Sequence, residues 1–184
     1  PEFSINQACD DWQSTKAAYR FFQNEKFGEK DIMRPHFEKT AGRCQNYPYV
    51  LALQDTTVIG YSHHPKTEGL GRIGGCPSAI GKTHGLNMHT TLAVTSHGLP
   101  LGLLSNTIWC TTGKQIRRDK RIDHLIPTSD KESFKWIHAL EQTHERVKAK
   151  VPTITICDRE CDMHDFYLAA FDLDSHFIVR NNAD

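Results

Sequence analysis

The sequence predicts a mixed α/β fold, in which a sheet has helices on both faces and is preceded by a small helical segment. Short apolar or β-branched runs, typical of buried strands, occur at residues 49–55 and 153–157. Two more strand-like runs flank a turn with Gly98 and Pro100, which predicts a hairpin. Helical and strand patterns then alternate, as they do in a sheet layered with helices.

Two helices are predicted in the N-terminal segment. The first covers residues 10–25 and has an amphipathic pattern. The second covers roughly residues 29–41, and its first turn would tolerate Pro35 whereas its interior would not, because proline lacks a backbone donor. The first helix has one largely aromatic stripe with basic residues beside it: Trp12, Thr15, Tyr19, Phe22, Lys16 and Arg20.

A strand, a loop and a hairpin follow. The run at 49–55 predicts a strand that is buried on both faces and ends in an acid. Residues 62–84 are rich in Gly, His and Pro and predict a loop. The hairpin strands are expected at 85–95 and 101–110, and a basic loop at 111–123 comes after them.

The last third of the chain predicts a helix, a strand, a second helix and a final strand. Ser129 and Glu132 form a capping-box pattern, so the first of these helices is expected to run from there to about residue 150, where Pro152 stops it. One face of this helix is expected to pack on the sheet, with Trp136, Ile137, Leu140, His144 and Val147. The later elements are expected at 153–157, 163–171 and 176–180.

Composition restricts the function classes. Lys plus Arg and Asp plus Glu are 22 each, so net charge alone gives no indication of nucleic-acid binding, and any basic surface must be local. Six cysteines without paired CxxC spacing argue against a zinc ribbon and suit reduced thiols. The sequence has no apolar run of about 18 residues and no signal-peptide pattern, so we expect a soluble cytoplasmic protein. Because it begins with Pro1, we expect it to be a fragment.

Two acids mark predicted strand ends. A buried strand cannot continue through Asp158, Arg159 and Glu160, because an unpaired buried carboxylate is costly, so the strand at 153–157 must end at a rim. Asp55 ends the earlier run. If the two strands are parallel neighbours, these carboxylates lie about 5 Å apart and repel each other, which a divalent ion would relieve.

A structural interpretation of the two acids is also open. Asp55 would cap a turn through Thr56 and Thr57, while Asp158 would pair with Arg159 or cap the following helix. The residue types alone do not decide between a metal site and these caps.

Two longer strings carry a family resemblance. "LALQDTTVIGY" and "ICDRECDMHDFY" resemble the first two acid-bearing motifs of bacterial cut-and-paste insertion-sequence transposases of the DDE type, which have a ribonuclease-H-like catalytic domain. "KAAYRFFQNE" resembles that family's N-terminal DNA-binding segment, "KESFKWI" the helix before the second acid, and "HFIVRNNAD" the strand after it.

The resemblance implies a DNA transposase that cuts and joins transposon ends by two-metal phosphoryl transfer. Residues 1–46 would then be a helical segment that contacts DNA, and 47–184 part of the catalytic domain. The family's third acid lies further along than residue 184, so we expect this chain to cut DNA poorly or not at all. Its partners would be double-stranded DNA, at transposon ends and targets, and a second copy of the chain on DNA, with no membrane partner.

The resemblance also implies site residues. Asp55 and Asp158 would be catalytic and would bind Mg²⁺, with Mn²⁺ as a substitute. Arg180, at the end of the last strand, resembles a DNA-contacting arginine, and a plain surface role is equally open. Tyr19 and Arg20 resemble DNA-facing positions, although a tyrosine on the apolar stripe is more often part of the core. The basic loop would contact phosphates or simply be solvated, and its cations are Lys114, Arg117, Arg118, Lys120 and Arg121.

Other functions remain open from sequence. One is a metal-dependent nuclease of the same fold, with Glu160 or Asp162 as a third acid, and another is a non-catalytic DNA-binding remnant. His89 and Thr56 would flank the site or belong to the core. A cysteine nucleophile has no supporting motif, and a zinc site has only a loose spacing and no evident fourth ligand, with Cys157, Cys161 and His164.

Overall fold

The computed structural model describes residues 4–61, 66–73, 84–110, 125–147 and 150–181. It divides into two compact units, Pro1–Pro35 and His36–Asp184. The boundary after residue 46, between a DNA-contacting segment and a catalytic part, stays a functional prediction. Within the described residues no helix is both long and apolar enough to span a membrane.

The N-terminal unit is built on helices. α1 covers Ile5–Ala8, and α2 covers Trp12–Phe22, whose first turn is capped by Asp11 accepting a 2.7 Å hydrogen bond from the Ser14 amide. The helical prediction is confirmed, but most of the predicted stripe is not buried. Thr15 is buried, whereas Trp12 is 73% and Phe22 70% exposed. This helix therefore presents aromatic side chains to solvent.

α3, at Glu29–Cys44, contains Pro35 in its interior, which the sequence analysis did not expect. The helix starts with the acids Glu29 and Asp31 in its first turn, where they interact favourably with the helix dipole. Its C-terminal part packs through Ala41 and Cys44 into the core of the second unit.

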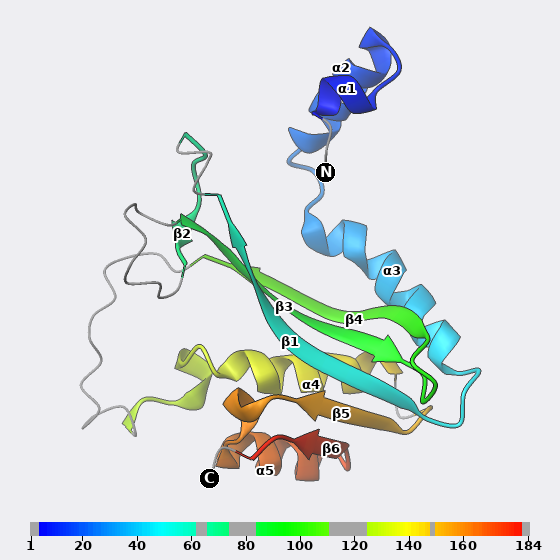
Figure 1. Ribbon diagram of the computed structural model, residues 1–184, viewed down its shortest axis with the longest axis vertical. Coiled ribbons are helices and arrows are strands. Elements are labelled where there is room, and N and C mark those ends of the chain that lie inside the picture. The colour runs from blue at the N-terminus through cyan, green and yellow to red at the C-terminus, as the bar shows by residue number, and fades with distance from the viewer. Residues whose placement is uncertain (1–3, 62–65, 74–83, 111–124, 148–149, 182–184) are drawn as a thin grey trace. The chain divides into compact units, whose positions relative to one another are not determined.

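A six-stranded mixed sheet forms the centre of the second unit (Figure 1). Its path is β2-β3-β1-β5-β6, and β4 also pairs with β3. β1 pairs antiparallel with β3 and parallel with β5, and β5 pairs parallel with β6. This arrangement confirms the predicted α/β class and is consistent with a ribonuclease-H-like fold. The strands are β1 Val50–Gly60, β2 Gly71–Arg72, β3 His84–Val94, β4 Pro100–Trp109, β5 Thr153–Cys157 and β6 His176–Val179.

Two helices pack on the sheet through two hydrophobic clusters. α4, at Phe134–Val147, and α5, at His164–Asp172, follow β4 and β5 respectively. The N-terminal half of α4 packs against α5 and the end of β5, with Trp136, Ile137, Leu140, Cys157, Cys161, Phe166 and Ala170 in one cluster. Its last residue, Val147, belongs to a second cluster with Val50, Ala93, Leu104 and Val151. α4 thus joins the two clusters, as its predicted stripe indicates.

β1 is longer than its sequence pattern predicts. It does not end at Asp55 but continues to Gly60, because its antiparallel ladder with β3 extends to the pair Gly60↔Gly85. Nor is it buried on both faces, since Val50 and Ala52 are buried while Leu51 and Leu53 are half-buried. The apolar run corresponds to the buried and half-buried part of β1, and the strand continues beyond it with mostly exposed residues.

The hairpin and the last strands follow the predictions, with one correction at α4. β3 and β4 pair antiparallel across a turn in which Gly98 has φ 86°, a conformation that glycine adopts without strain. The expected capping box is wrong, because Ser129 lies in a short 3₁₀ helix at Thr128–Asp130, ahead of Phe134 where α4 begins.

Candidate functional site

The register of three parallel strands aligns the predicted acids. β1 and β5 pair from Val50↔Thr153 to Leu53↔Ile156, so the positions two residues further on are Asp55 and Asp158. The two strands are parallel neighbours, as the sequence predicts. Neighbouring strands lie about 4.8 Å apart, and Asp158 keeps an extended backbone after β5 ends. The register therefore places Asp55 and Asp158 at the same level along the two neighbouring strands.

Arg180 continues the same alignment. β5 and β6 pair as far as Cys157↔Val179, and one residue further on are Asp158 and Arg180. The Arg180 amide donates a 3.3 Å hydrogen bond to the Cys157 carbonyl, which extends the parallel ladder past β6. An exposed cation thus follows at the carboxyl end of the third strand, although β6 itself ends at Val179 rather than at Arg180.

The two acids have different local surroundings. Asp55 is exposed inside β1, and since side chains alternate along a strand it shares the face of Leu51 and Leu53. Asp158 is exposed and caps the 3₁₀ helix at Arg159–Cys161, accepting a 2.8 Å hydrogen bond from the Glu160 amide. One carboxylate oxygen of Asp158 therefore has a structural role, which agrees with the capping alternative and leaves the second oxygen for other ligands.

Glu160 and Asp162, the other acids of this turn, have protein partners. The Glu160 carboxylate lies 3.3 Å from the Lys135 ammonium group of α4. Asp162 accepts a 2.6 Å hydrogen bond from the Tyr167 hydroxyl, and this bond raises the pKa of Tyr167 to about 12. In the described parts of the chain, no cluster of three or more His, Cys, Asp or Glu side chains is suited to hold a metal ion.

Lys135 is a site-edge residue that the sequence analysis did not single out. Its side chain is only 10% exposed and lies within 5.8 Å of the Trp109 ring centroid and 5.7 Å of that of Trp136. It also lies 3.9 Å from Glu132, one helical turn away, and this spacing was the only signal for it in the sequence. Lys135 places a buried positive charge beside the turn that carries Asp158.

His89 links the two residues that flank Asp55. Its Nδ1 lies 2.8 Å from the Thr56 hydroxyl and its Nε2 3.2 Å from Gln54 Oε1. Because Gln54 offers a carbonyl oxygen, a neutral imidazole that donates from Nε2 and accepts from Thr56 at Nδ1 satisfies both contacts. The ring is 1% exposed and meets Trp136 edge to face, with 4.6 Å between the centroids. The sequence raised His89 only as a flanking or core residue.

The environment of His89 keeps its imidazole neutral. Burial, followed by the positive charge of Lys135, lowers its pKa from 6.5 to about 4, although the negative charge of Asp158 opposes this shift. His89 is therefore a fixed neutral hydrogen-bonding group beneath the segment of β1 that carries Asp55.

The cysteines near the site are structural thiols. Cys157 and Cys161 are buried in the cluster formed by α4 and α5. A hydrogen bond with Cys157, together with burial, raises the pKa of the Cys161 thiol. Zinc binding and nucleophilic attack both require the thiolate, so this environment favours neither.

The predicted DNA-contacting residues lie in separate parts of the chain. Arg20 is exposed on α2, and the neighbouring Tyr19 hydroxyl donates a 3.3 Å hydrogen bond to Asn6 of α1. Lys16 is also exposed on this helix, which contains no acidic residue. The cations of the basic loop lie outside the described residues, at Lys114, Arg117, Arg118, Lys120 and Arg121.

A comparison with protein families finds a similarity in the N-terminal part of the chain. Residues 1–27 match the family model described as transposase DNA-binding. The match contains both α1 and α2. It supports a transposase and supports DNA as its partner, as the sequence predicts.

The state of His89 gives a pH prediction. In the unfolded chain this imidazole takes up a proton near pH 6.5, and in the folded protein only near pH 4. Between these values the unfolded state binds more protons, so the free energy of unfolding should fall as the pH is lowered, by about 3 kcal/mol in total. Urea unfolding curves between pH 7.5 and pH 4, in about half-unit steps, measure this loss.

Two glutamine variants complete the test. His89→Gln should remove most of the pH dependence in this window, because glutamine does not titrate. His97→Gln, in the exposed turn between β3 and β4, should leave it unchanged. A wild-type stability that is constant from pH 7 to pH 4, or a full pH dependence in His89→Gln, would contradict a buried neutral imidazole.

Proposed function

We propose that the chain is the N-terminal and leading catalytic portion of a DDE-type DNA transposase of the bacterial insertion-sequence class, which cuts and joins transposon-end DNA. The observation that carries this proposal is the shared register of Asp55 and Asp158 on neighbouring parallel strands of a mixed sheet. The transposase DNA-binding match over residues 1–27 supports it independently.

Asp55 and Asp158 would hold a divalent cation. Their carboxylate oxygens are the hard ligands that Mg²⁺ prefers, with Mn²⁺ as a substitute, and both residues are exposed and open to phosphate oxygens. Such an ion supplies a Lewis acid for phosphoryl transfer and lowers the pKa of a bound water or hydroxyl. Two carboxylates provide fewer oxygen ligands than two ions require, so we expect cleavage by these 184 residues to be slow.

The remaining residues of the edge position the acids and the DNA. His89 donates a hydrogen bond to Gln54 and accepts one from Thr56, and these bonds fix β1 on either side of Asp55. The hydrogen bond from the Glu160 amide to the Asp158 carboxylate fixes the backbone around Asp158. Arg180, next in register, supplies a positive charge for a DNA phosphate beside the reacting one. Assembly as a homodimer on DNA is part of the same proposal.

The N-terminal unit would provide sequence-independent affinity for DNA. α2 exposes Lys16 and Arg20, which attract phosphates, and exposes the aromatic rings of Trp12 and Phe22. A non-catalytic DNA-binding protein is the second candidate. Asp158 accepts a hydrogen bond from the Glu160 amide, and this capping role requires no metal ion. Metal-dependent cleavage distinguishes the two candidates.

Substitution of either acid tests the catalytic role. In a longer chain that also carries the third acid implied by the resemblance, Asp55→Asn and Asp158→Asn should each lower metal-dependent nicking of duplex DNA by at least about a hundredfold, because the lost charge weakens metal binding. Each variant should also bind Mn²⁺ more weakly, as measured by electron paramagnetic resonance of the free ion. Asparagine caps helices as well as aspartate does, so the turn after Asp158 is retained.

Asp172→Asn serves as the matched control for these variants. Asp172 is an exposed carboxylate at the end of α5, so both nicking and Mn²⁺ binding should stay at wild-type levels. DNA binding should be unchanged in all three variants. If Asp55→Asn or Asp158→Asn nicks DNA and binds Mn²⁺ like the wild type, the acids are structural and the non-catalytic candidate is correct.

Substitution of Arg20 tests the DNA-contacting role of α2. DNA affinity should fall as salt rises, and Arg20→Ala should lower the slope of log K against log salt by about 0.9, since one phosphate contact is lost. Lys39→Ala, at an exposed position of α3, should leave the slope unchanged. Fluorescence anisotropy with a labelled duplex at roughly 50 to 200 mM salt measures both. An unchanged slope in Arg20→Ala would contradict the contact.

A further inference from the structure

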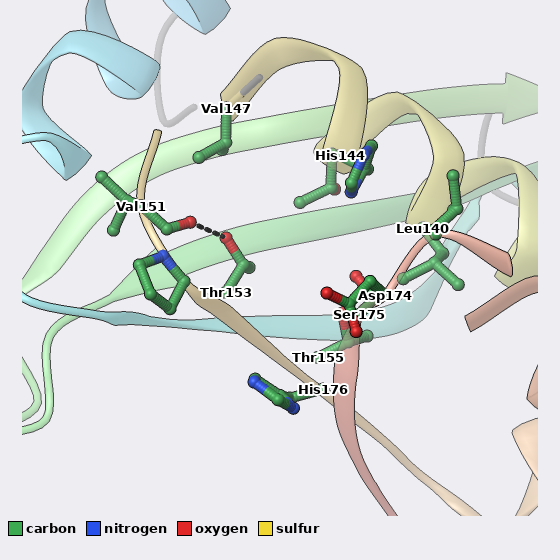
Figure 2. A pocket seen from close by; sticks show the side chains of 12 residues that line it. Leu140, His144, Val147, Val151, Thr153, Thr155, Asp174, Ser175 and His176 are labelled. Carbon is green, nitrogen blue, oxygen red and sulfur yellow. Dashed lines mark hydrogen bonds between the residues drawn. The ribbon is translucent and has the colours of Figure 1, made fainter. Parts of the chain in front are cut away.

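A cavity of about 230 Å³ lies in the second unit, away from the candidate acids (Figure 2). It is lined by α4, by the start of β5 and by the turn that leads into β6, and it is partly open to solvent. These are the amino ends of β5 and β6, whereas Asp158 and Arg180 follow their carboxyl ends. The lining residues are of three kinds, namely buried hydroxyls, apolar side chains and polar groups at the mouth.

Two hydroxyls in this cavity are buried without a hydrogen-bond partner. Thr143 and Thr155 are each 1% exposed, and both Oγ1 atoms lack a partner among the described residues. Most buried polar atoms in proteins are hydrogen-bonded, so two such groups in one cavity are unusual. Thr153 differs, because its hydroxyl donates a 3.2 Å hydrogen bond to the Val151 carbonyl (Figure 2).

The cavity has one acidic lining residue among those described. Among the twelve described lining residues, Asp174 is the single one of the Asp, Glu, Lys and Arg types. It occupies a left-handed backbone conformation, with φ 49°, in the turn before β6. Its side chain is exposed and belongs to the lining drawn in the close-up view (Figure 2). The described lining contains no lysine or arginine, and its other titratable side chains are His144 and His176.

Aliphatic side chains form one part of the wall. Leu140 and Val147 of α4, Val151 before β5 and Leu173 after α5 line it. Aliphatic side chains of this kind favour a methylene chain rather than a fully polar ligand. A volume of 230 Å³ equals roughly seven or eight water molecules at about 30 Å³ each, which sets the size of a ligand of similarly few heavy atoms.

We propose that this cavity binds a small aliphatic ammonium compound. An ammonium group has three N–H donors, and the lining offers three acceptors for them in the Thr143 hydroxyl, the Thr155 hydroxyl and the Asp174 carboxylate. The alkyl chain packs against Leu140 and Val147. This site is separate from the proposed metal site and does not depend on transposase activity.

A titration with matched four-carbon probes tests the ligand class. The 184-residue chain, labelled with ¹⁵N, is titrated with n-butylammonium, butyrate or 1-butanol, and amide shifts are followed. n-Butylammonium should give saturable shifts centred on Thr143, Thr155 and Asp174, with an affinity at least about tenfold above that of butyrate, which the carboxylate repels. Shifts that do not saturate, or equal affinity for butyrate, would overturn the proposal.

Variants of the acceptors locate the site. Thr155→Val should weaken n-butylammonium binding about two- to tenfold, as expected for one hydrogen bond, and Thr143→Val should act likewise. Asp174→Asn, which tolerates the left-handed backbone, should weaken it by about threefold or more, since ion pairs open to water are modest. Asp172→Asn, two residues away and outside the lining, should have no effect.

Two outcomes with these variants would overturn the proposed ammonium site. Loss of binding in Asp172→Asn to the same degree as in Asp174→Asn would show a general surface effect and overturn the site. Unchanged n-butylammonium binding in both threonine variants would show that neither hydroxyl contacts the ligand, and this too would overturn the site. Thermal unfolding confirms that each variant is folded, and Thr155→Val should be at least as stable as the wild type, because it removes a buried hydroxyl that has no partner.

Discussion

The parallel pairing of β1 with β5 is the constraint on which the candidate site depends. Its register places Asp55 level with Asp158, and the pairing of β5 with β6 places Arg180 level with Asp158. A shift of one residue would turn Asp55 to the opposite face of the sheet, because strand side chains alternate. The backbone hydrogen bonds of three strands therefore determine whether two acids and one cation meet at one edge.

Side-chain contacts link α4 both to β1 and to the turn after β5. His89 spans Gln54 and Thr56, and its ring packs on Trp136, so α4 is coupled to the segment of β1 that carries Asp55. Lys135, one residue before Trp136, pairs with Glu160 in the turn after Asp158. A neutral imidazole suits this position, since a charged one would be costly beside Lys135 in a buried environment.

The sequence predicted the strands and helices better than their extents and contacts. β-Branched and apolar runs located β1, β3 and β5, whereas the end of β1 was misplaced at Asp55 because an exposed acid inside a strand resembles a terminus. The bonds of His89 were not predictable, because they require the pairing of Thr56 with His89 across two strands. The Ser129 pattern was misleading because a 3₁₀ helix occupies it.

The position of a bound divalent ion tests the account most directly. Crystals grown with Mn²⁺ should show an anomalous scattering peak bridged by the Asp55 and Asp158 carboxylates, with Mn²⁺–oxygen distances of about 2.0 to 2.6 Å. The same peak should be absent in Asp55→Asn crystals that keep the β1–β5 register. A peak at another site, or carboxylates that point to opposite faces of the sheet, would contradict a shared metal site at this edge.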